Sequence, residues 1–167
     1  MRIFLIAAGA LILLIFSGSC TKKKDVRMVE MGELAVIGPY RYKAYETLWP
    51  LSLGDRVPKD RFLVVKLTVE NDLDQHSTVP SIDLVDDAGN VIPELSDGTG
   101  VEHWLGMVRT LTKDQPADGA VVFDTAPRQY MLRVADDADN FMYIRMPFNL
   151  NSEAPQAQPE TPSPQKK

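Results

Sequence analysis

The only cysteine of the chain, Cys20, stands where its thiol could receive a covalent group. It directly follows three small residues, Ser17, Gly18 and Ser19. Small side chains beside a scissile bond are typical of the cleavage site of a secretory signal peptide. We therefore expect cleavage between Ser19 and Cys20, which would make Cys20 the new N-terminus.

The segment that positions this site has the composition of a signal peptide. Arg2 precedes an unbroken apolar run, Ile3–Phe16, and such a basic and apolar sequence ending in small residues directs secretion. With Cys20 at its end, the segment resembles a bacterial lipoprotein signal in which Ser17 replaces the usual aliphatic residue. The resemblance implies a diacylglyceryl group on Cys20, with palmitate-type chains. Each buried methylene contributes about 0.8 kcal/mol, so several chains anchor a protein without a spanning helix.

The same residues leave an uncleaved transmembrane helix as an alternative. No charged residue lies between Ile3 and Thr21, and about 20 apolar residues suffice to cross a bilayer. Lys22–Lys24 would then favour a cytoplasmic domain. The Ser-Gly-Ser-Cys end is poor hydrophobic filler, so the sequence favours the lipoprotein.

Side chains that commonly catalyse reactions are few beyond this segment. His76 and His103 are the only histidines, and no Gly-x-Ser-x-Gly pattern is present. Nucleophilic catalysis needs a nucleophile held beside a base, so we predict that the protein is not an enzyme. Asp136–Asn140 crowds acidic groups but lacks the spacing of a calcium-binding loop. We expect a solvated turn there, with no metal and no cofactor.

Aromatic residues offer a possible partner surface. Tyr40–Trp49 contains three tyrosines and a tryptophan, and Trp104 follows a glycine-rich stretch. Aromatic side chains in loops are favoured anchors for partners, although packing inside a sandwich is their commoner role. If a binding surface exists, we expect Trp49, His103 and Trp104 to form it.

Composition restricts the classes of partner. The chain has 167 residues and a net charge of −5. Loss of Arg2 with the signal leaves 17 basic against 23 acidic side chains, a net charge of −6. Proteins that read nucleic acid carry basic patches, so we expect no nucleic acid partner. With Cys20 lipidated, no thiol remains for a disulfide or a zinc site.

The chain divides by composition into four parts. Residues 1–19 are the predicted signal peptide, and residues 20–32 form a charged tether. Residues 33–150 form one domain, which is an ordinary domain length. Residues 151–167 are rich in proline and polar residues and are predicted to be disordered.

The domain carries the pattern of a β protein. Residues 61–70 alternate between apolar and polar types, which predicts a half-buried strand. Asp86–Asn90 is a predicted hairpin turn, because Gly and Asn tolerate positive φ. Further strands are expected at 33–38, 40–47, 78–85, 120–124, 130–134 and 141–145. Many short strands separated by turns indicate an antiparallel sandwich or barrel.

Two of these stretches, Phe62–Asn71 and Ile82–Asn90, resemble the telokin-like, immunoglobulin-like extracellular domain of bacterial lipoproteins. Gly119–Asp124 and Tyr130–Val134 are similar to its closing strands. The similarity covers residues 33–150, apart from the segment 95–105. It implies an immunoglobulin-like, all-β antiparallel sandwich. The family is largely a domain of unknown function and implies no catalytic residues.

The function expected from these features is anchoring at a membrane. We predict an extracytoplasmic lipoprotein that acts as a non-enzymatic binding module. Its partners would be the lipid bilayer, through acylated Cys20, and an envelope protein. Thr21, rather than Asp, after the cysteine resembles outer-membrane sorting in hosts that have two membranes; otherwise we expect the outer face of the plasma membrane. A structural envelope component and a single-pass membrane protein remain as alternatives.

Overall fold

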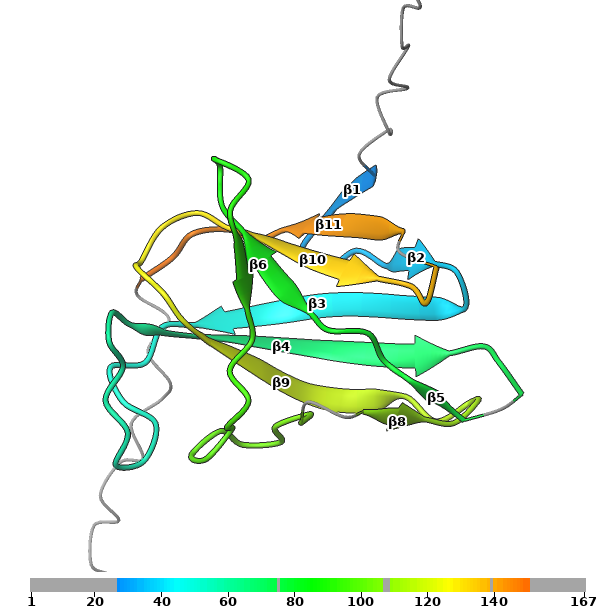
Figure 1. Cartoon of the computed structure of the whole chain (residues 1–167), viewed down its shortest axis with the longest axis horizontal. Helices are drawn as coiled ribbons and strands as arrows, with labels where there is room; N and C mark the ends of the chain where they lie inside the picture. The colour runs from blue at the N-terminus through cyan, green and yellow to red at the C-terminus, as the bar shows by residue number, and fades with distance from the viewer. Residues whose placement is uncertain (1–26, 75, 107–108, 139, 151–167) are drawn as a thin grey trace, which may run out of the picture.

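The computed structural model describes residues 27–150 except 75, 107–108 and 139. The predicted signal peptide, Cys20 and the proline-rich tail lie outside the described residues. Within those residues the secondary structure consists of strands, and two sheets pack face to face (Figure 1). The predicted all-β sandwich is confirmed. No helix that could span a bilayer occurs in the described part of the chain.

The first sheet has the strand order β1-β11-β10-β6-β7. Its strands are Arg27–Glu30, Phe141–Arg145, Met131–Ala135, Asp83–Val85 and Val91–Pro93. The pairs are antiparallel except for β1, which runs parallel to β11. The segment predicted as a charged tether therefore contains an edge strand. This strand forms because Val29, on the inner face of β1, packs against the core.

The second sheet has the order β2-β3-β4-β9, and all its pairs are antiparallel. Its strands are Ala35–Ile37, Tyr40–Leu48, Phe62–Asn71 and Ala117–Asp124. Two short strands, β5 (Ser77–Thr78) and β8 (Thr110–Leu111), pair separately. The single strand predicted at 78–85 is divided into β5 and β6. Pro80 lies between them, and proline cannot donate to a strand ladder.

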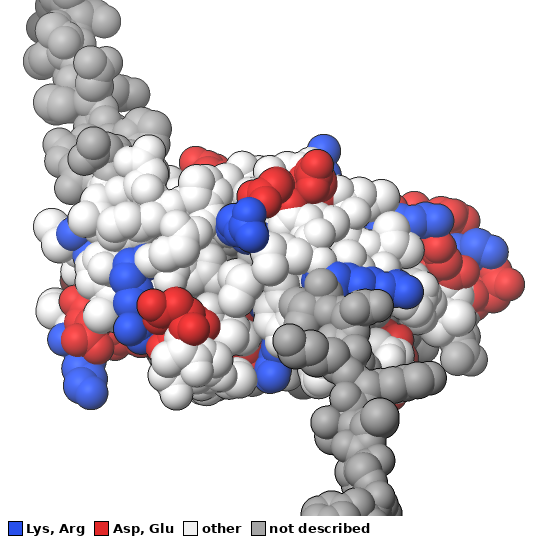
Figure 2. Space-filling model, turned by 90° about the horizontal axis from the view of Figure 1, so that it is seen from above, with Lys and Arg blue, Asp and Glu red and all other residues white. Residues whose placement is uncertain are grey.

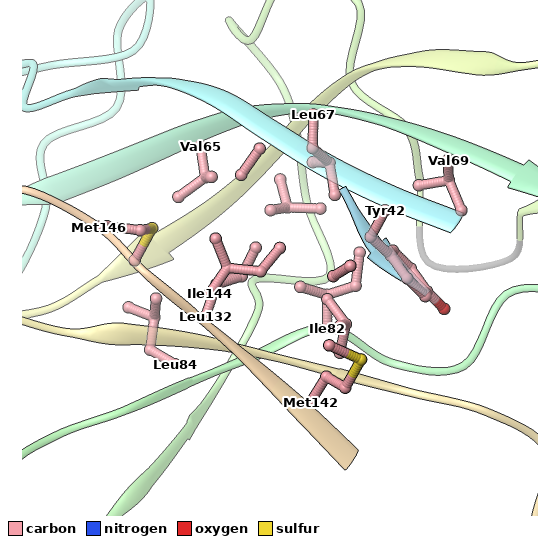
Figure 3. Close-up of a cluster of buried hydrophobic side chains, with 14 of the residues drawn as sticks. Tyr42, Val65, Leu67, Val69, Ile82, Leu84, Leu132, Met142, Ile144 and Met146 are labelled. Atoms are coloured by element: carbon pink, nitrogen blue, oxygen red, sulfur yellow. The ribbon is translucent and has the colours of Figure 1, made fainter. Parts of the chain in front are cut away.

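The main core lies between the two sheets (Figure 3). Leu67 from the second sheet and Leu132 and Ile144 from the first are fully buried there. Tyr42 also faces this core, and its hydroxyl donates to the carbonyl oxygen of Ala135 at 2.9 Å, which joins the two sheets. The alternation in the sequence thus arises from one face of each strand turning inward.

A second, smaller core lies on the outer face of the second sheet. Phe62 and Val64 of β4 pack there with Val122 of β9 and with Leu53 from the loop between β3 and β4. Leu95 also packs against this cluster. The start of β4 is therefore buried on both faces, which explains why Phe62–Val65 is an unbroken apolar run.

Candidate functional sites

Trp49, one of the residues predicted to anchor a partner, lies in the core. Only 2% of it is exposed, at the end of β3. Its ring meets Phe148 edge-on, with centroids 5.9 Å apart, and lies 6.4 Å from the ring of Tyr130. Trp49 thus closes one end of the sandwich and does not present its ring at the surface as the sequence suggested.

Trp104 is held in place by a glycine. The residue is partly buried, and a Cβ atom at Gly98 would stand 2.0 Å from Cδ2 of its ring. The indole therefore occupies the space that a side chain at Gly98 would fill. Position 100 also has no room for a side chain, because a Cβ there would lie 2.6 Å from the backbone of Leu53.

The backbone around Trp104 extends the second sheet. The amide of Ala120 donates to the carbonyl oxygen of His103 at 2.9 Å, and the amide of Leu105 donates to that of Ala120 at 3.0 Å. Trp104 and Ala120 thus form a parallel bridge beside β9. An uncovered edge strand invites pairing with another chain, so the segment shields this edge.

His103 is the exposed part of this segment. Its side chain is 77% exposed, and Nε2 lies 3.5 Å from the carboxylate of Glu102. Its φ of 53° is in the left-handed region that favours glycine, and such outliers often occur at functional sites. The structure therefore places His103 and Trp104 side by side on one segment and Trp49 elsewhere, in the core.

Two acidic turns repeat the same hydrogen bonds. In the turn between β6 and β7, Asp86 Oδ1 accepts from the amides of Ala88 and Asn90 at 3.0 and 2.8 Å. In the turn between β10 and β11, Asp136 Oδ1 accepts from Ala138 and Asn140, both at 2.9 Å.

These hydrogen bonds lower the pKa values of the two aspartates. The hydrogen bonds from Asn90 and Asn140 hold the pKa of Asp86 and of Asp136 below the usual 3.8. Both carboxylates thus stabilise their own turns. Among the described residues, no three His, Cys, Asp or Glu side chains are grouped so as to hold a metal ion.

A buried ion pair lies in the connection between β7 and β8. An Arg109 nitrogen, Nη2, donates to Glu94 Oε2, and the two side chains are 2% and 1% exposed. Burial raises the pKa of Glu94, and Arg109 opposes that effect. Arg109 Nε and Nη1 have no hydrogen-bond partner among the described residues. Glu94 directly follows β7 and Arg109 directly precedes β8, so the pair joins the two ends of one connection, and nothing in the sequence pattern marks it.

A groove of about 590 Å³ lies where β10 begins and β11 ends. Three methionines contribute to its lining, Met31, Met131 and Met146, together with Tyr130 and Arg145. Methionine is flexible and polarizable, and it is common at adaptable binding surfaces. The methionines are far apart in the sequence and meet only because β1, β10 and β11 pair. Sequence reasoning therefore missed this groove.

Comparison with known proteins identifies the fold. No family model and no curated protein matches the chain. Among solved structures, it is similar to the yjhA protein of Bacillus subtilis, with a TM-score of 0.55 and 14% identity over 73% of this chain and 100% of that one.

Two further structures are similar. One is the secreted protein MPT63 of Mycobacterium tuberculosis, with a TM-score of 0.55 and 12% identity over 72% of this chain and 97% of that one. The other is ycdA of Bacillus subtilis, described as a lipoprotein candidate, with a TM-score of 0.51 and 14% identity over 70% of this chain and 39% of that one. At these identities the likeness shows the fold alone. The domain is a β-sandwich of unknown function, and the more specific family resemblance stays a prediction.

Proposed function

We propose that the protein is a lipid-anchored, extracytoplasmic binding module without enzymatic activity. The observation that carries the proposal is Cys20 at the end of a signal-like segment, separated from the first strand by six residues. A cleaved and acylated Cys20 would join an edge strand of a folded domain to the membrane through a very short linker.

The comparisons support an exported location. MPT63 is a secreted protein and ycdA is described as a lipoprotein candidate, and both share the β-sandwich. Folds of this kind serve many unrelated functions, so the location is proposed from the Cys20 motif and the fold adds support.

The carboxyl groups with perturbed pKa support a structural rather than a catalytic use of charge. Asp86 and Asp136 bind the amides of their own turns, and Asp97 accepts from the amide of Thr99 at 2.9 Å. Glu94 is paired with Arg109. Perturbed acids are also typical of active sites, but each of these is used by the fold.

The segment that carries His103 and Trp104 is the proposed contact with an envelope protein. Its strained backbone at His103 is fixed by the pairing of the segment with β9. A rigid, exposed loop loses little conformational entropy when it binds.

Labelling with a clickable fatty acid, followed by cell fractionation, tests the anchoring. The parent protein should carry the label and remain with membranes, because its only thiol is acylated. The Cys20→Ala variant should lose the label and show a processing defect. Cys20→Ala changes no residue of the described domain, so the domain of the variant should fold as that of the parent does. A difference in labelling then reports on Cys20 alone. An unlabelled parent that still remains with membranes would contradict the proposal and favour the transmembrane alternative.

A further inference from the structure

The outer face of the first sheet combines exposed apolar and basic side chains. Met28, Phe141 and Val91 are 39%, 37% and 46% exposed. The strand pairing places Met28 beside Tyr143 and Arg133, and Glu30 beside Arg145 and Met131. The groove lined by Met31, Met131 and Met146 opens along the same sheet.

The basic groups of this face are held close to its apolar groups. The Arg133 guanidinium lies 4.8 Å from the centre of the Phe141 ring and donates to Asp83 at 2.6 Å. Arg145 donates to Glu30 at 2.8 Å and contacts the sulfur of Met28 at 3.0 Å. Aromatic, thioether and guanidinium groups together suit the boundary between lipid headgroups and acyl chains.

The position of Cys20 restricts which face can meet a bilayer. Only residues 21–26 separate Cys20 from Arg27, the first residue of β1. Even fully extended, that stretch spans at most about 25 Å, and a flexible chain of this length averages about 15 Å. A domain of this size is about 35 Å across. The start of β1 therefore has to stay near the lipid, and the far side of the domain cannot turn toward it.

Exposed apolar side chains distinguish the two surfaces that adjoin the start of β1. One is the end of the sandwich, where Asp72, Asp74 and Asp137 lie in loops. On the other, the outer face of the first sheet, Arg133 and Arg145 are paired with Asp83 and Glu30, and Met28, Phe141 and Val91 are exposed. Apolar side chains bind the lipid interface through the area that they bury there, so the outer face is the better match. Figure 2 looks onto the upper side of Figure 1, where this sheet lies, and uncharged surface covers much of it.

We infer that the outer face of the first sheet is a docking surface for the bilayer to which Cys20 is attached. This inference rests on the proposed lipid anchor. Met28 and Phe141 lie at the lipid interface, with the Arg133–Asp83 and Arg145–Glu30 pairs beside them. The second sheet then faces away from the membrane, together with His103 and Trp104, which lie beside β9.

The test uses single introduced cysteines as sites for a fluorescent label. Met28→Cys and Phe141→Cys place the label on the proposed docking surface. Tyr45→Cys is the matched control, because Tyr45 is 40% exposed and lies on the outer face of the second sheet, beside Lys66. The full-length acylated protein is reconstituted into vesicles of phosphatidylethanolamine and phosphatidylglycerol. Quenching by aqueous iodide and by brominated lipids is then measured.

Labels at 28 and 141 should be quenched by brominated lipid, and their quenching by iodide should fall about twofold or more, because interfacial groups lie several ångströms deep. The label at 45 should keep the iodide quenching of the unanchored domain. Equal iodide quenching at all three positions on vesicle-bound protein would overturn the docking surface alone. Intact mass separates this result from failure of the anchor: one label per chain means that Cys20 is blocked, and two labels would overturn both proposals.

Discussion

At the scale of single residues, the main finding is that charge is used to build turns and to fix loops. Asp86 and Asp136 occupy equivalent positions in two hairpins and bind the same set of backbone amides. Each also accepts from the side-chain amide of the asparagine four residues later, at 2.9 and 2.8 Å. The sequence predicted both turns, but not that their carboxylates would be bonded so fully by their own loops.

These turns should make stability depend on pH in the acidic range. The pKa values of Asp86 and Asp136 in the folded protein lie below the 3.8 of the unfolded chain. Their contribution is therefore complete above that value and is lost as the pH falls through the lower folded pKa. Thermal unfolding from about pH 5 to about pH 2 should show a smaller loss of stability in the Asp86→Asn/Asp136→Asn double variant than in the parent. Asp87→Asn controls for removal of one charge from the same turn. An unchanged slope in the double variant would contradict this role.

The buried Glu94–Arg109 pair gives a second prediction at this scale. Arg109→Met should reduce the free energy of unfolding by about 3–5 kcal/mol, because it leaves a buried carboxylate without its partner. Glu94→Leu/Arg109→Met should recover most of this loss, since a buried pair and an apolar pair of similar volume are often equally stable. Urea denaturation measures both. A single variant as stable as the parent would show that the pair is not buried in solution.

At the scale of elements, the positions of most strands could be predicted from the sequence, whereas the packing between distant segments could not. Residues 61–70 were expected to form a strand and do so as β4, because a period of two is a local signal. β1 was missed, since its four residues lie among charges and pair only with β11, more than 100 positions away. The groove was also missed, because its lining residues are distant in the sequence and meet only through the pairing of β1, β10 and β11. The sequence made Trp49 a candidate surface anchor, although packing inside a sandwich is the commoner role of such aromatics, and its contacts with Phe148 and Tyr130 place it in the core.

Gly98 supplies the prediction at this scale. Gly98→Ala should destabilise the domain by about 1–3 kcal/mol, because overpacking displaces buried groups, and the Trp104 ring stands where the new methyl group would be. Tryptophan emission should move toward the red as Trp104 becomes exposed, and Trp104→Phe identifies its share of the signal. Ser96→Ala, at an exposed position of the same loop, should leave both stability and emission unchanged. Parent-like behaviour of Gly98→Ala would mean that the ring does not pack on Gly98.

At the scale of the whole molecule, the two faces of the sandwich have different expected surroundings. The first sheet carries β1 and therefore the short linker to Cys20. The second sheet has its outer face partly covered by loops, and one of its edges is shielded by the segment with Trp104. Anchoring through Cys20 would thus both retain the domain at the membrane and orient it. A domain on a long linker would be retained without being oriented.

The mass of the mature protein tests the central claim most directly. Membrane-extracted protein is measured intact, and its N-terminal peptide is then fragmented to locate any modification. The anchoring proposal predicts a chain that begins at Cys20, with a diacylglyceryl group on its sulfur. A chain that begins at Met1 and carries no lipid on Cys20 would contradict it.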